Sequence, residues 1–401
     1  MTTESPVTAV DVVIFGGGVA GLWLLARLRE QGYQAVLLES QALGAGQTRY
    51  AQGIIHGGTK YALTGKLTGS SEAIAEMPPI WRACLVGEGE LDLSAVKLLS
   101  PNQFMWSTEN LTSRMAGFFA SKLMRSRTNA VEGDERPEIF RNPAFHGQVY
   151  RLEEPVLDTA SLVHALAEPH REAIYKLHDT EALQLNKSER GRRVVSGDIR
   201  LDARRVVFAA GKGNAALLQK CEHRAPAMQL RPLNMVMLRG GPNHPLPGVL
   251  YAHCLGAGAN PRITITTHYD SEGRTVWYLG GRIAEEGVRR DHKSQVAAAK
   301  RELGELFPWL DLSDAEWGIL SIDRAEPGMA DGSRPDNAFA EEQDGIITAW
   351  PTKLALSPRL AKVVIEKIQQ GGVQPGAETE LPDWPHPGYA PLPWQEEERW
   401  N

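Results

Sequence analysis

Short apolar runs with the pattern of buried strands alternate with runs of helical period along the chain. Asp11–Phe15 (DVVIF) predicts a buried strand, Val19–Gln31 a helix, and Gln34–Ser40 (QAVLLES) a second strand. This order is typical of an α/β domain with a parallel sheet. Further helices are expected at Leu67–Val86, Ser113–Arg127, Asp158–Ala167, Lys293–Leu306 and Leu354–Gln369.

The middle of the chain is dense in strands. The pattern of Ala182–Ala210 predicts several strands. Further strands are predicted within Met228–Arg282 by the runs MVML, GVLYAH, RITITTHY and TVWYLGGRI, of which the last two are joined by a DSEG turn. WGILSI and GIITAW predict two more strands near the end. Because 401 residues exceed one ordinary core, we expect two domains.

Composition and charge narrow the class of protein. With 42% hydrophobic and 23% charged residues, the chain is globular, and its net charge of −6 argues against nucleic-acid partners. No apolar stretch approaches the roughly 18 residues of a membrane span, so no integral membrane segment is expected. The start of the chain has no basic leader, and the three cysteines form neither a metal pattern nor a disulfide framework. We therefore expect a cytoplasmic protein without a metal site.

The strongest local motif is a glycine fingerprint directly after the first strand. Gly16, Gly18 and Gly21 form G-x-G-x-x-G and open the first helix, where unpaired amides favour a pyrophosphate. Glu39 follows about 18 residues after Gly21, at the end of the second strand, where its carboxylate can accept ribose hydroxyls. The sequence therefore predicts a dinucleotide site. A second fingerprint and a CxxC pair are both missing, which argues against pyridine-nucleotide–flavin reductases and redox-active disulfides.

Three further stretches carry a resemblance to a known family. They are Gly44–Tyr61 (GAGQTRYAQGIIHGGTKY), Arg204–Leu218 (RRVVFAAGKGNAALL) and the pair WGILSIDRAEP and GIITAWPTKLALSPRLA. Together they resemble the D-amino-acid-oxidase-like FAD-dependent oxidoreductases. The likeness is greatest to glycerol-3-phosphate dehydrogenases, L-2-hydroxyglutarate oxidases and glycine-oxidase-like members. One departure is that Ala349, Trp350 and Pro351 stand where the family has glycines.

The resemblance implies an α/β fold with an α+β second domain. A glutathione-reductase-like FAD-binding Rossmann domain would be assembled from three separate segments of the chain, with a mixed-sheet substrate domain inserted between them. The expected FAD-binding parts are residues 1–85, 153–220 and 318–375, and the expected substrate parts are 86–152 and 221–317. Residues 376–401 are expected to form a C-terminal arm, and its part Leu381–Asn401, rich in Pro and Trp, is expected to be irregular and to lie on the surface.

Fingerprint and resemblance together imply non-covalently bound FAD. The expected cofactor-binding residues are Gly16, Gly18, Val19, Ala20, Gly21, Glu39, Ser40, Gln47, Thr48, Arg49, Gln52, Gly53, Ala182, Ala209, Ala210, Gly211, Thr352, Lys353 and Leu354.

Two cations near the end of the chain are candidates for catalysis. Lys353, at the start of the last helix, is placed to stabilise negative charge on a reduced flavin, or is a solvated lysine. Arg324 lies in an apolar strand and should have an anionic partner. That partner is either Asp323 or Glu326 in a structural pair, or a substrate carboxylate or phosphate.

The histidines offer further candidates. Four alternatives stand for His56. It accepts a proton, donates a hydrogen bond to the flavin, is a covalent attachment point for the flavin, or is a buried histidine bonded to backbone. Lys60 adds positive charge to the substrate pocket or lies on the surface. Tyr251 and His253 share one strand face by period two and are pocket candidates, whereas His268 is expected at the periphery.

The expected reaction is hydride transfer from a small anionic substrate, a 2-hydroxy acid or polyol phosphate, to flavin N5. A glycine-oxidase-like amine oxidase, a flavin-binding protein without turnover and an RNA-modifying module are the alternatives. The electron acceptor is left open between oxygen, quinone and a carrier protein. The basic helix Ser113–Arg127 either docks on a membrane or covers the second domain.

Overall fold

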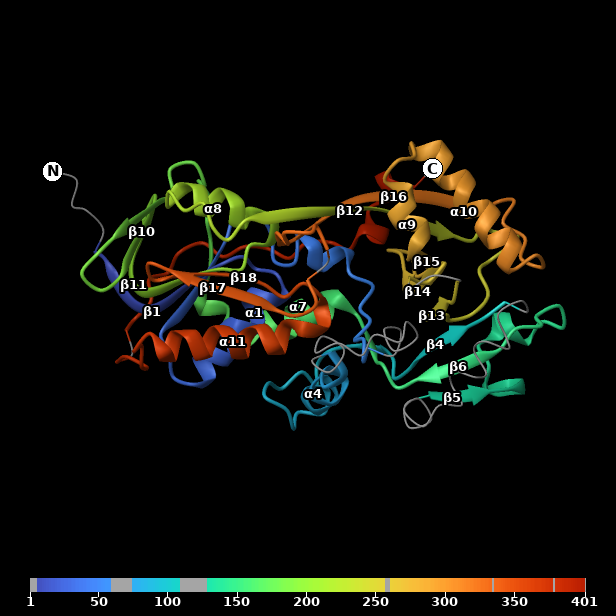
Figure 1. Cartoon of the computed structure of the whole chain (residues 1–401), viewed down its shortest axis with the longest axis horizontal. Coiled ribbons are helices and arrows are strands. Elements are labelled where there is room, and N and C mark those ends of the chain that lie inside the picture. The colour runs from blue at the N-terminus through green and yellow to red at the C-terminus, as the bar shows by residue number, and fades with distance from the viewer. Residues whose placement is uncertain are drawn as a thin grey trace.

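Two sheet-based domains lie side by side along the long axis of the molecule (Figure 1). The computed structural model describes residues 6–58, 74–108, 128–256, 260–333, 335–377 and 379–400. Lys60 and the predicted helix Ser113–Arg127 lie outside these residues. The domain that carries the glycine fingerprint is called the first domain below, and the other the second domain.

The sheet of the first domain is assembled from separate stretches of the chain. Five parallel strands run in the order β18-β11-β1-β2-β8, an antiparallel β17 extends one edge, and a β9–β10 hairpin continues from β11. The strand bounds are Thr8–Phe15 (β1), Ala35–Glu39 (β2), Ile174–Lys176 (β8), Gln184–Lys187 (β9), Arg192–Ser196 (β10), Ile199–Phe208 (β11), Phe339–Gln343 (β17) and Ile346–Trp350 (β18).

Helix α1 (Val19–Glu30) is buried on nearly all sides because it packs between this sheet and two other helices. Its neighbours are α7 (Thr159–Ala167), which Asp158 caps, and α11 (Ser357–Gln370) (Figure 1). The first core joins these helices to β1 and β2, whose residues are almost all buried, as parallel strands covered on both faces require. Helices α4 (Met77–Leu85) and α8 (Asn214–Lys220) also belong to this domain.

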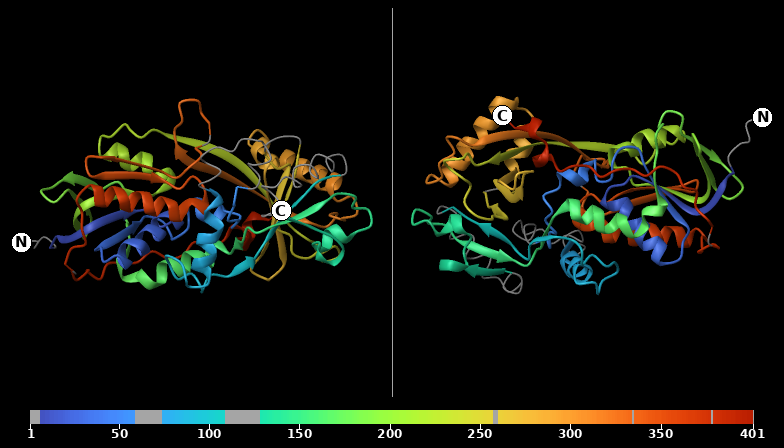
Figure 2. Two further views of the ribbon diagram at one scale, coloured as in Figure 1. Left: turned by 60° about the horizontal axis from the view of Figure 1, so that its bottom comes forward. Right: turned by 180° about the vertical axis from the view of Figure 1, so that it is seen from behind.

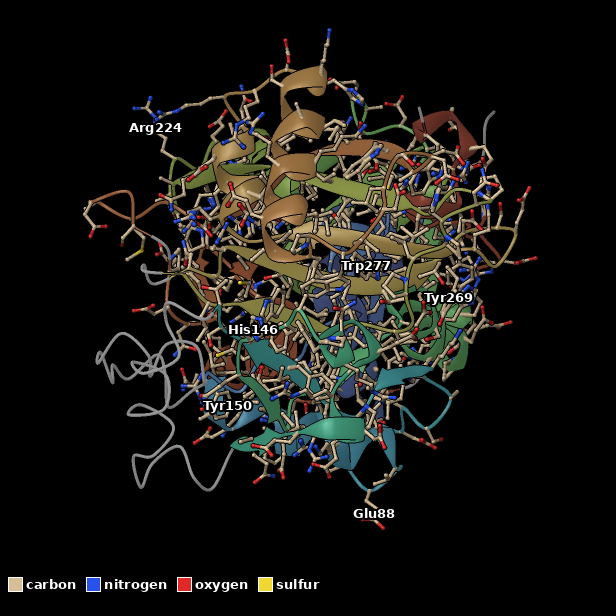
Figure 3. All side chains as sticks on the ribbon, turned by 90° about the vertical axis from the view of Figure 1, so that its right-hand side faces the viewer. Glu88, His146, Tyr150, Arg224, Tyr269 and Trp277 are labelled. Carbon is tan, nitrogen blue, oxygen red and sulfur yellow. The ribbon has the colours of Figure 1, made fainter. Side chains whose placement is uncertain are left out.

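The second domain is built on a largely antiparallel sheet in the order β16-β12-β15-β14-β13-β4-β6-β5, where β13 and β4 are the only parallel pair among the described strands. Its outer face packs against α9 (Arg282–Gly287) and α10 (His292–Leu306), with Trp277 fully buried beneath them (Figure 3). The strand bounds are Gln103–Trp106 (β4), Thr128–Val131 (β5), Val149–Leu152 (β6), Met228–Arg239 (β12), Ala252–Cys254 (β13), Ile263–Tyr269 (β14), Thr275–Gly280 (β15) and Glu316–Pro327 (β16). Two short strands, Leu98–Ser100 (β3) and Val156–Leu157 (β7), pair with each other.

The long strands β12 and β16 connect the two domains. They pair along their whole length and reach from the second sheet to the first domain (Figures 1 and 2). There the Ala325 amide donates to Gln47 Oε1 at 3.0 Å. The predicted domain boundary at residue 318 therefore falls inside β16, all of which pairs with β12.

The C-terminal arm differs from the surface arm predicted from the sequence. It first pairs with the first domain, where the Ala390 amide donates to the Leu43 carbonyl at 3.0 Å. It then enters the contact between the domains, and Leu392, Trp394 and Trp400 are buried there. They pack on what we call the inner face of the second sheet, which carries Met235, Met237, Tyr278, Leu320 and Ile322.

His268, expected at the periphery, is buried under this arm. Its ring stacks on Trp394 at 3.8 Å between centroids, and Thr266 Oγ1 lies 3.0 Å from its Nε2. Burial lowers the pKa of His268 to about 3, so the ring is neutral at physiological pH.

An ion cluster holds the end of the arm to the second sheet. The buried Arg239 guanidinium pairs with Asp270 at 3.0 Å, Glu316 at 2.9 Å and Glu397 at 3.0 Å. It also lies over the Trp400 ring, 4.5 Å from the centroid. One cation therefore joins strands β12 and β16, the turn after β14 and the arm.

Replacing Arg239 with methionine is expected to destabilise the protein by about 3 kcal/mol, because Asp270, whose side chain is fully buried, loses a cationic partner. The midpoint of urea unfolding, followed by tryptophan fluorescence, measures this. Arg282→Met is the control, since its pair with Glu286 spans 3.6 Å between half-exposed side chains and should change stability by less than about 0.5 kcal/mol. Equal midpoints for the two variants would show that the cluster contributes no stability.

Candidate active site

Two fingerprint glycines are required by the packing of the first domain itself. Gly16 has φ +112°, and a Cβ there would lie 2.6 Å from the Ala210 Cα and 2.7 Å from the Ala209 carbonyl oxygen. A Cβ on Gly21 would lie 2.0 Å from the Gly16 carbonyl oxygen. The end of β1, the start of α1 and the end of β11 therefore meet backbone to backbone.

Gly18 differs, because among the described residues a Cβ there would meet only Thr48 Oγ1, at 3.1 Å. It is the residue before α1, and neither a capping side chain nor an acid is found in the first turn among the described residues. The Val19 amide donates to Thr48 Oγ1 at 3.2 Å, and Ala20 follows it in the helix. This helix start keeps the space and the positive dipole end that a pyrophosphate needs.

Glu39 lies at the end of β2, beside this turn. The Gly17 amide donates to its Oε2 and the Gln41 amide to its Oε1, both at 2.6 Å. Since a carboxylate offers about four acceptor positions, it can still accept two ribose hydroxyls.

Leu177 lies beside this acid, and its amide donates to the Glu39 carbonyl at 2.9 Å. The sequence analysis did not single out this residue. Ala182, which the sequence predicts as a cofactor-binding residue, is exposed on the loop before β9, and its amide donates to Asp179 Oδ1. The exposed Ser40 follows Glu39, and its carbonyl accepts from Lys176.

The loop after β2 is tied to several distant elements. Gln52 Nε2 donates to the Tyr278 carbonyl at 3.0 Å, and Arg49 pairs with Glu396 of the arm at 2.6 Å. A Cβ on Gly53 would lie 2.0 Å from the Leu157 carbonyl oxygen, so the loop runs tightly against β7. These contacts fix the loop between the two domains.

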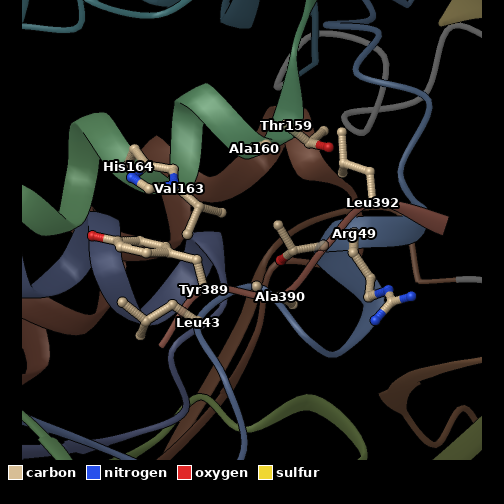
Figure 4. Close-up of a pocket in the computed structure, with 11 residues that line it drawn as sticks. Leu43, Arg49, Thr159, Ala160, Val163, His164, Tyr389, Ala390 and Leu392 are labelled. Carbon is tan, nitrogen blue, oxygen red and sulfur yellow. The ribbon is translucent and has the colours of Figure 1, made fainter. Parts of the chain in front are cut away.

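A small cavity lies between this loop, α7 and the arm (Figure 4). Its described lining is mostly apolar, with Leu43, Val163 and Leu392 beside Arg49 and Thr159. None of the residues expected on the substrate side is among the described residues that line it.

The ends of β11 and β18 form the other side of the dinucleotide turn. Ala209 donates to the Phe15 carbonyl at 2.9 Å, and the buried Asn214 joins Ala210 to the Ala349 carbonyl. Trp350, one of the residues that replace the family's glycines, donates its indole N–H to the Gly211 carbonyl at 3.1 Å. The replacement thus adds a link between the two strand ends.

The chain then turns at Thr352, which has φ +61° and donates to the Asn337 carbonyl at 3.1 Å. Lys353 leads into a 3₁₀ turn, Leu354–Leu356, and α11 begins only at Ser357. The sequence predicts Lys353 at the start of a helix Leu354–Gln369. In the structure it precedes the 3₁₀ turn, and α11 begins four residues after it.

Two predicted site residues from different domains come together. The rings of His56 and His253 stack with centroids 5.4 Å apart and an interplanar angle of 26°. His56 Nδ1 lies 3.4 Å from Glu154 Oε2, and His253 Nδ1 lies 2.7 Å from Thr264 Oγ1. The side chain of Glu154 is buried. The sequence analysis did not single out this residue.

Tyr251 packs against Ile54 and Val156, next to the loop that carries His56. Burial raises the pKa of its hydroxyl above the usual range, so it is protonated at physiological pH.

Arg324 lies on the inner face of the second sheet, following Leu320 and Ile322 by strand alternation. Its Nε donates to the Arg231 carbonyl at 3.4 Å. His253 lies on the same face. It pairs with Thr264, which shares a face of β14 with Thr266, and Thr266 pairs with Tyr278 of the inner face. Three strands, β12, β15 and β14, separate β16 from β13.

The two carboxylates considered as structural partners of Arg324 contact other cations. Asp323 pairs with Lys212 at 2.7 Å, and Glu326 lies 3.5 Å from Arg231 Nε. Both assignments of Arg324 named from the sequence stay predictions, but these carboxylates have alternative partners.

Residues 11–357 match the model of the DAO family, described as FAD dependent oxidoreductase. The chain belongs to this family. It is an FAD-dependent oxidoreductase, and the glycine turn, the open start of α1 and Glu39 are the features of this chain that fit the dinucleotide.

Similar proteins agree with this membership. A probable FAD-dependent oxidoreductase of Pseudomonas aeruginosa is 49% identical over 388 residues, 96% of this chain and 98% of that protein. The crystal structure of the Pseudomonas aeruginosa oxidoreductase has a TM-score of 0.85 over 97% of this chain and 98% of its own. Glycine oxidase from Geobacillus kaustophilus shares the fold at 17% identity, with a TM-score of 0.66 over 94% and 97% of the two chains. In the described part of the chain, no helix is long and apolar enough to cross a bilayer.

Gly18→Val is expected to fold but to lose FAD, because the new side chain would fill the space left for the pyrophosphate, whereas its Cβ would approach Thr48 Oγ1 to 3.1 Å and no backbone atom of the described residues. Flavin released into the supernatant by acid precipitation, per mole of purified protein, measures the loss. Gly304→Val, where a Cβ meets nothing within 4 Å, is the control and should retain the flavin. A Gly18→Val protein with full flavin content would contradict the assignment of this turn.

Proposed function

We propose that this oxidoreductase acts on a small anionic substrate with a hydroxyl on the carbon that is oxidised, a 2-hydroxy acid or a polyol phosphate. The observation that carries the proposal is the His56–His253 pair, which joins the loop of the first domain to the inner face of the second. When bound, FAD supplies the acceptor for the hydride at its N5 atom.

The histidine pair suits an alcohol substrate because of where the proton must go. An alcohol does not ionise in water near neutral pH, so a base has to take the hydroxyl proton while the C–H bond breaks. An amine needs only its neutral form, which solvent can supply. A histidine in a largely buried site is the side chain best suited to accept that proton near pH 7.

The anionic group of the substrate would be bound from the inner face of the second sheet. Arg324 offers a planar guanidinium that can hold a carboxylate or phosphate by two hydrogen bonds. Lys353 and Lys60 are proposed to add positive charge, and Tyr251 to border the pocket.

Anaerobic mixing of the oxidised protein with sn-glycerol 3-phosphate, L-2-hydroxyglutarate, L-lactate, glycine and L-proline tests the proposal through bleaching of the flavin absorbance. We expect a hydroxy compound to bleach it, and dithionite serves as the control that the flavin can be reduced. Bleaching by the amino acids alone would favour an amine oxidase, and no bleaching by any of them would contradict the proposal. Admitting oxygen afterwards separates an oxidase from an enzyme that uses a quinone or a carrier protein.

Arg324→Ala should keep the FAD content and the melting temperature and weaken binding of the anionic compound that bleaches the flavin by about 2–4 kcal/mol. Titration of the bleaching rate against substrate concentration measures this. Arg324→Lys keeps the charge but loses the two-pronged geometry, so its substrate affinity should lie between those of the wild type and Arg324→Ala. If Arg324 is instead part of a structural pair, its removal would destabilise the fold by about 3–5 kcal/mol and leave substrate affinity unchanged.

A further inference from the structure

Glu154 is a buried carboxylate that receives three donors. It lies between β6 and β7, and only 5% of its side chain is exposed. The Gly57 amide donates to Oε1 at 2.7 Å, and the Gln103 side-chain amide donates to Oε2. His56 Nδ1 faces the same Oε2 at 3.4 Å. These donors come from the loop after β2 and from β4.

The backbone of the loop is fitted closely over this carboxylate. A Cβ on Gly57 would lie 3.2 Å from Glu154 Oε1 and 3.1 Å from Pro78 Cγ. The other side of the His56 ring is bounded by His253, whose own Nδ1 lies against Thr264. His56 is therefore restrained both along its edge and across its face.

An ionised carboxylate can only accept hydrogen bonds, so the nitrogen that faces it must carry the hydrogen. For a neutral His56 this places the hydrogen on Nδ1 and leaves the lone pair on Nε2.

We propose that Glu154 is a positioning residue that holds His56 in the Nδ1–H tautomer and aims Nε2 as the proton acceptor of the reaction. The source of the proton rests on the proposed function, whereas the tautomer does not. In the reaction the hydroxyl proton passes to Nε2, the hydride leaves the carbon for the flavin, and a C=O bond forms in the product. The carboxylate then stabilises the imidazolium that results.

Nitrogen-15 spectra of histidine-labelled holoenzyme test the tautomer without any substrate. At about pH 8, above the ordinary histidine pKa of about 6.5, we expect His56 to carry its hydrogen on Nδ1. Loss of its resonances in His56→Gln assigns them. Glu154→Gln keeps the size of the side chain but not its charge, and should give a mixture of tautomers. Glu90→Gln is the matched control, since Glu90 bonds to Trp23 of α1, and should leave the His56 resonances unchanged.

A wild-type His56 with its hydrogen on Nε2 would overturn the proposal, even if Glu154→Gln fails to fold. So would an unchanged Nδ1–H tautomer in folded Glu154→Gln.

A kinetic measurement asks whether the positioning matters for the chemistry. With sn-glycerol 3-phosphate as reductant, Glu154→Gln should lower the limiting rate of anaerobic flavin reduction on the order of 100-fold, with little change in the concentration that gives half that rate. A residue that only stabilises the loop would lower the melting temperature or flavin content and leave the limiting rate unchanged, which would contradict the proposal. If the wild type is not reduced by this compound, its choice as substrate fails, and the tautomer spectra alone decide on Glu154.

Discussion

The close approach of three backbone segments at the glycine turn is the constraint on which the molecule depends. The Gly16 carbonyl occupies the place that a side chain at residue 21 would need, and Gly16 itself touches the end of β11. Only glycine meets this requirement, and meeting it brings the carboxyl ends of β1, β2 and β11 to one edge of the sheet. The helix start left open there fits the pyrophosphate of a dinucleotide.

The second domain is held at a fixed place relative to that edge by polar contacts through the loop after β2. Gln47 reaches β16 and Gln52 reaches β14 and β15, while Arg49 joins the loop to the arm. These side chains are predicted from the sequence to bind the cofactor, and in the structure each contacts another element. The same contacts join the two domains that carry the stacked rings of His56 and His253.

Local patterns in the sequence predicted the parts of the fold that depend on neighbours in the chain. The fingerprint, the first two strands and α10 were found because their periodicity and glycine spacing are complete within a few residues. The burial of the inner face of the second sheet under the arm was not predicted, because Leu392, Trp394 and Trp400, which cover it, are distant from its strands along the chain. Nothing near residue 154 distinguishes its carboxylate from a surface acid, since its role arises from Gly57 and His56, about 98 residues away along the chain. The short α9 and edge strand β17 were missed for a similar reason, as their stability comes from the sheets they lie against.

The burial of the arm has a consequence for how the protein is made in the cell. During synthesis the strands of the second sheet are made before residues 392–400, so the arm cannot cover the apolar inner face until those residues have left the ribosome. The β18 strand and α11, which complete the first domain, also come late in synthesis. Both domains therefore complete their cores only after these late segments have been made, and until then the nascent chain exposes apolar surface that favours aggregation.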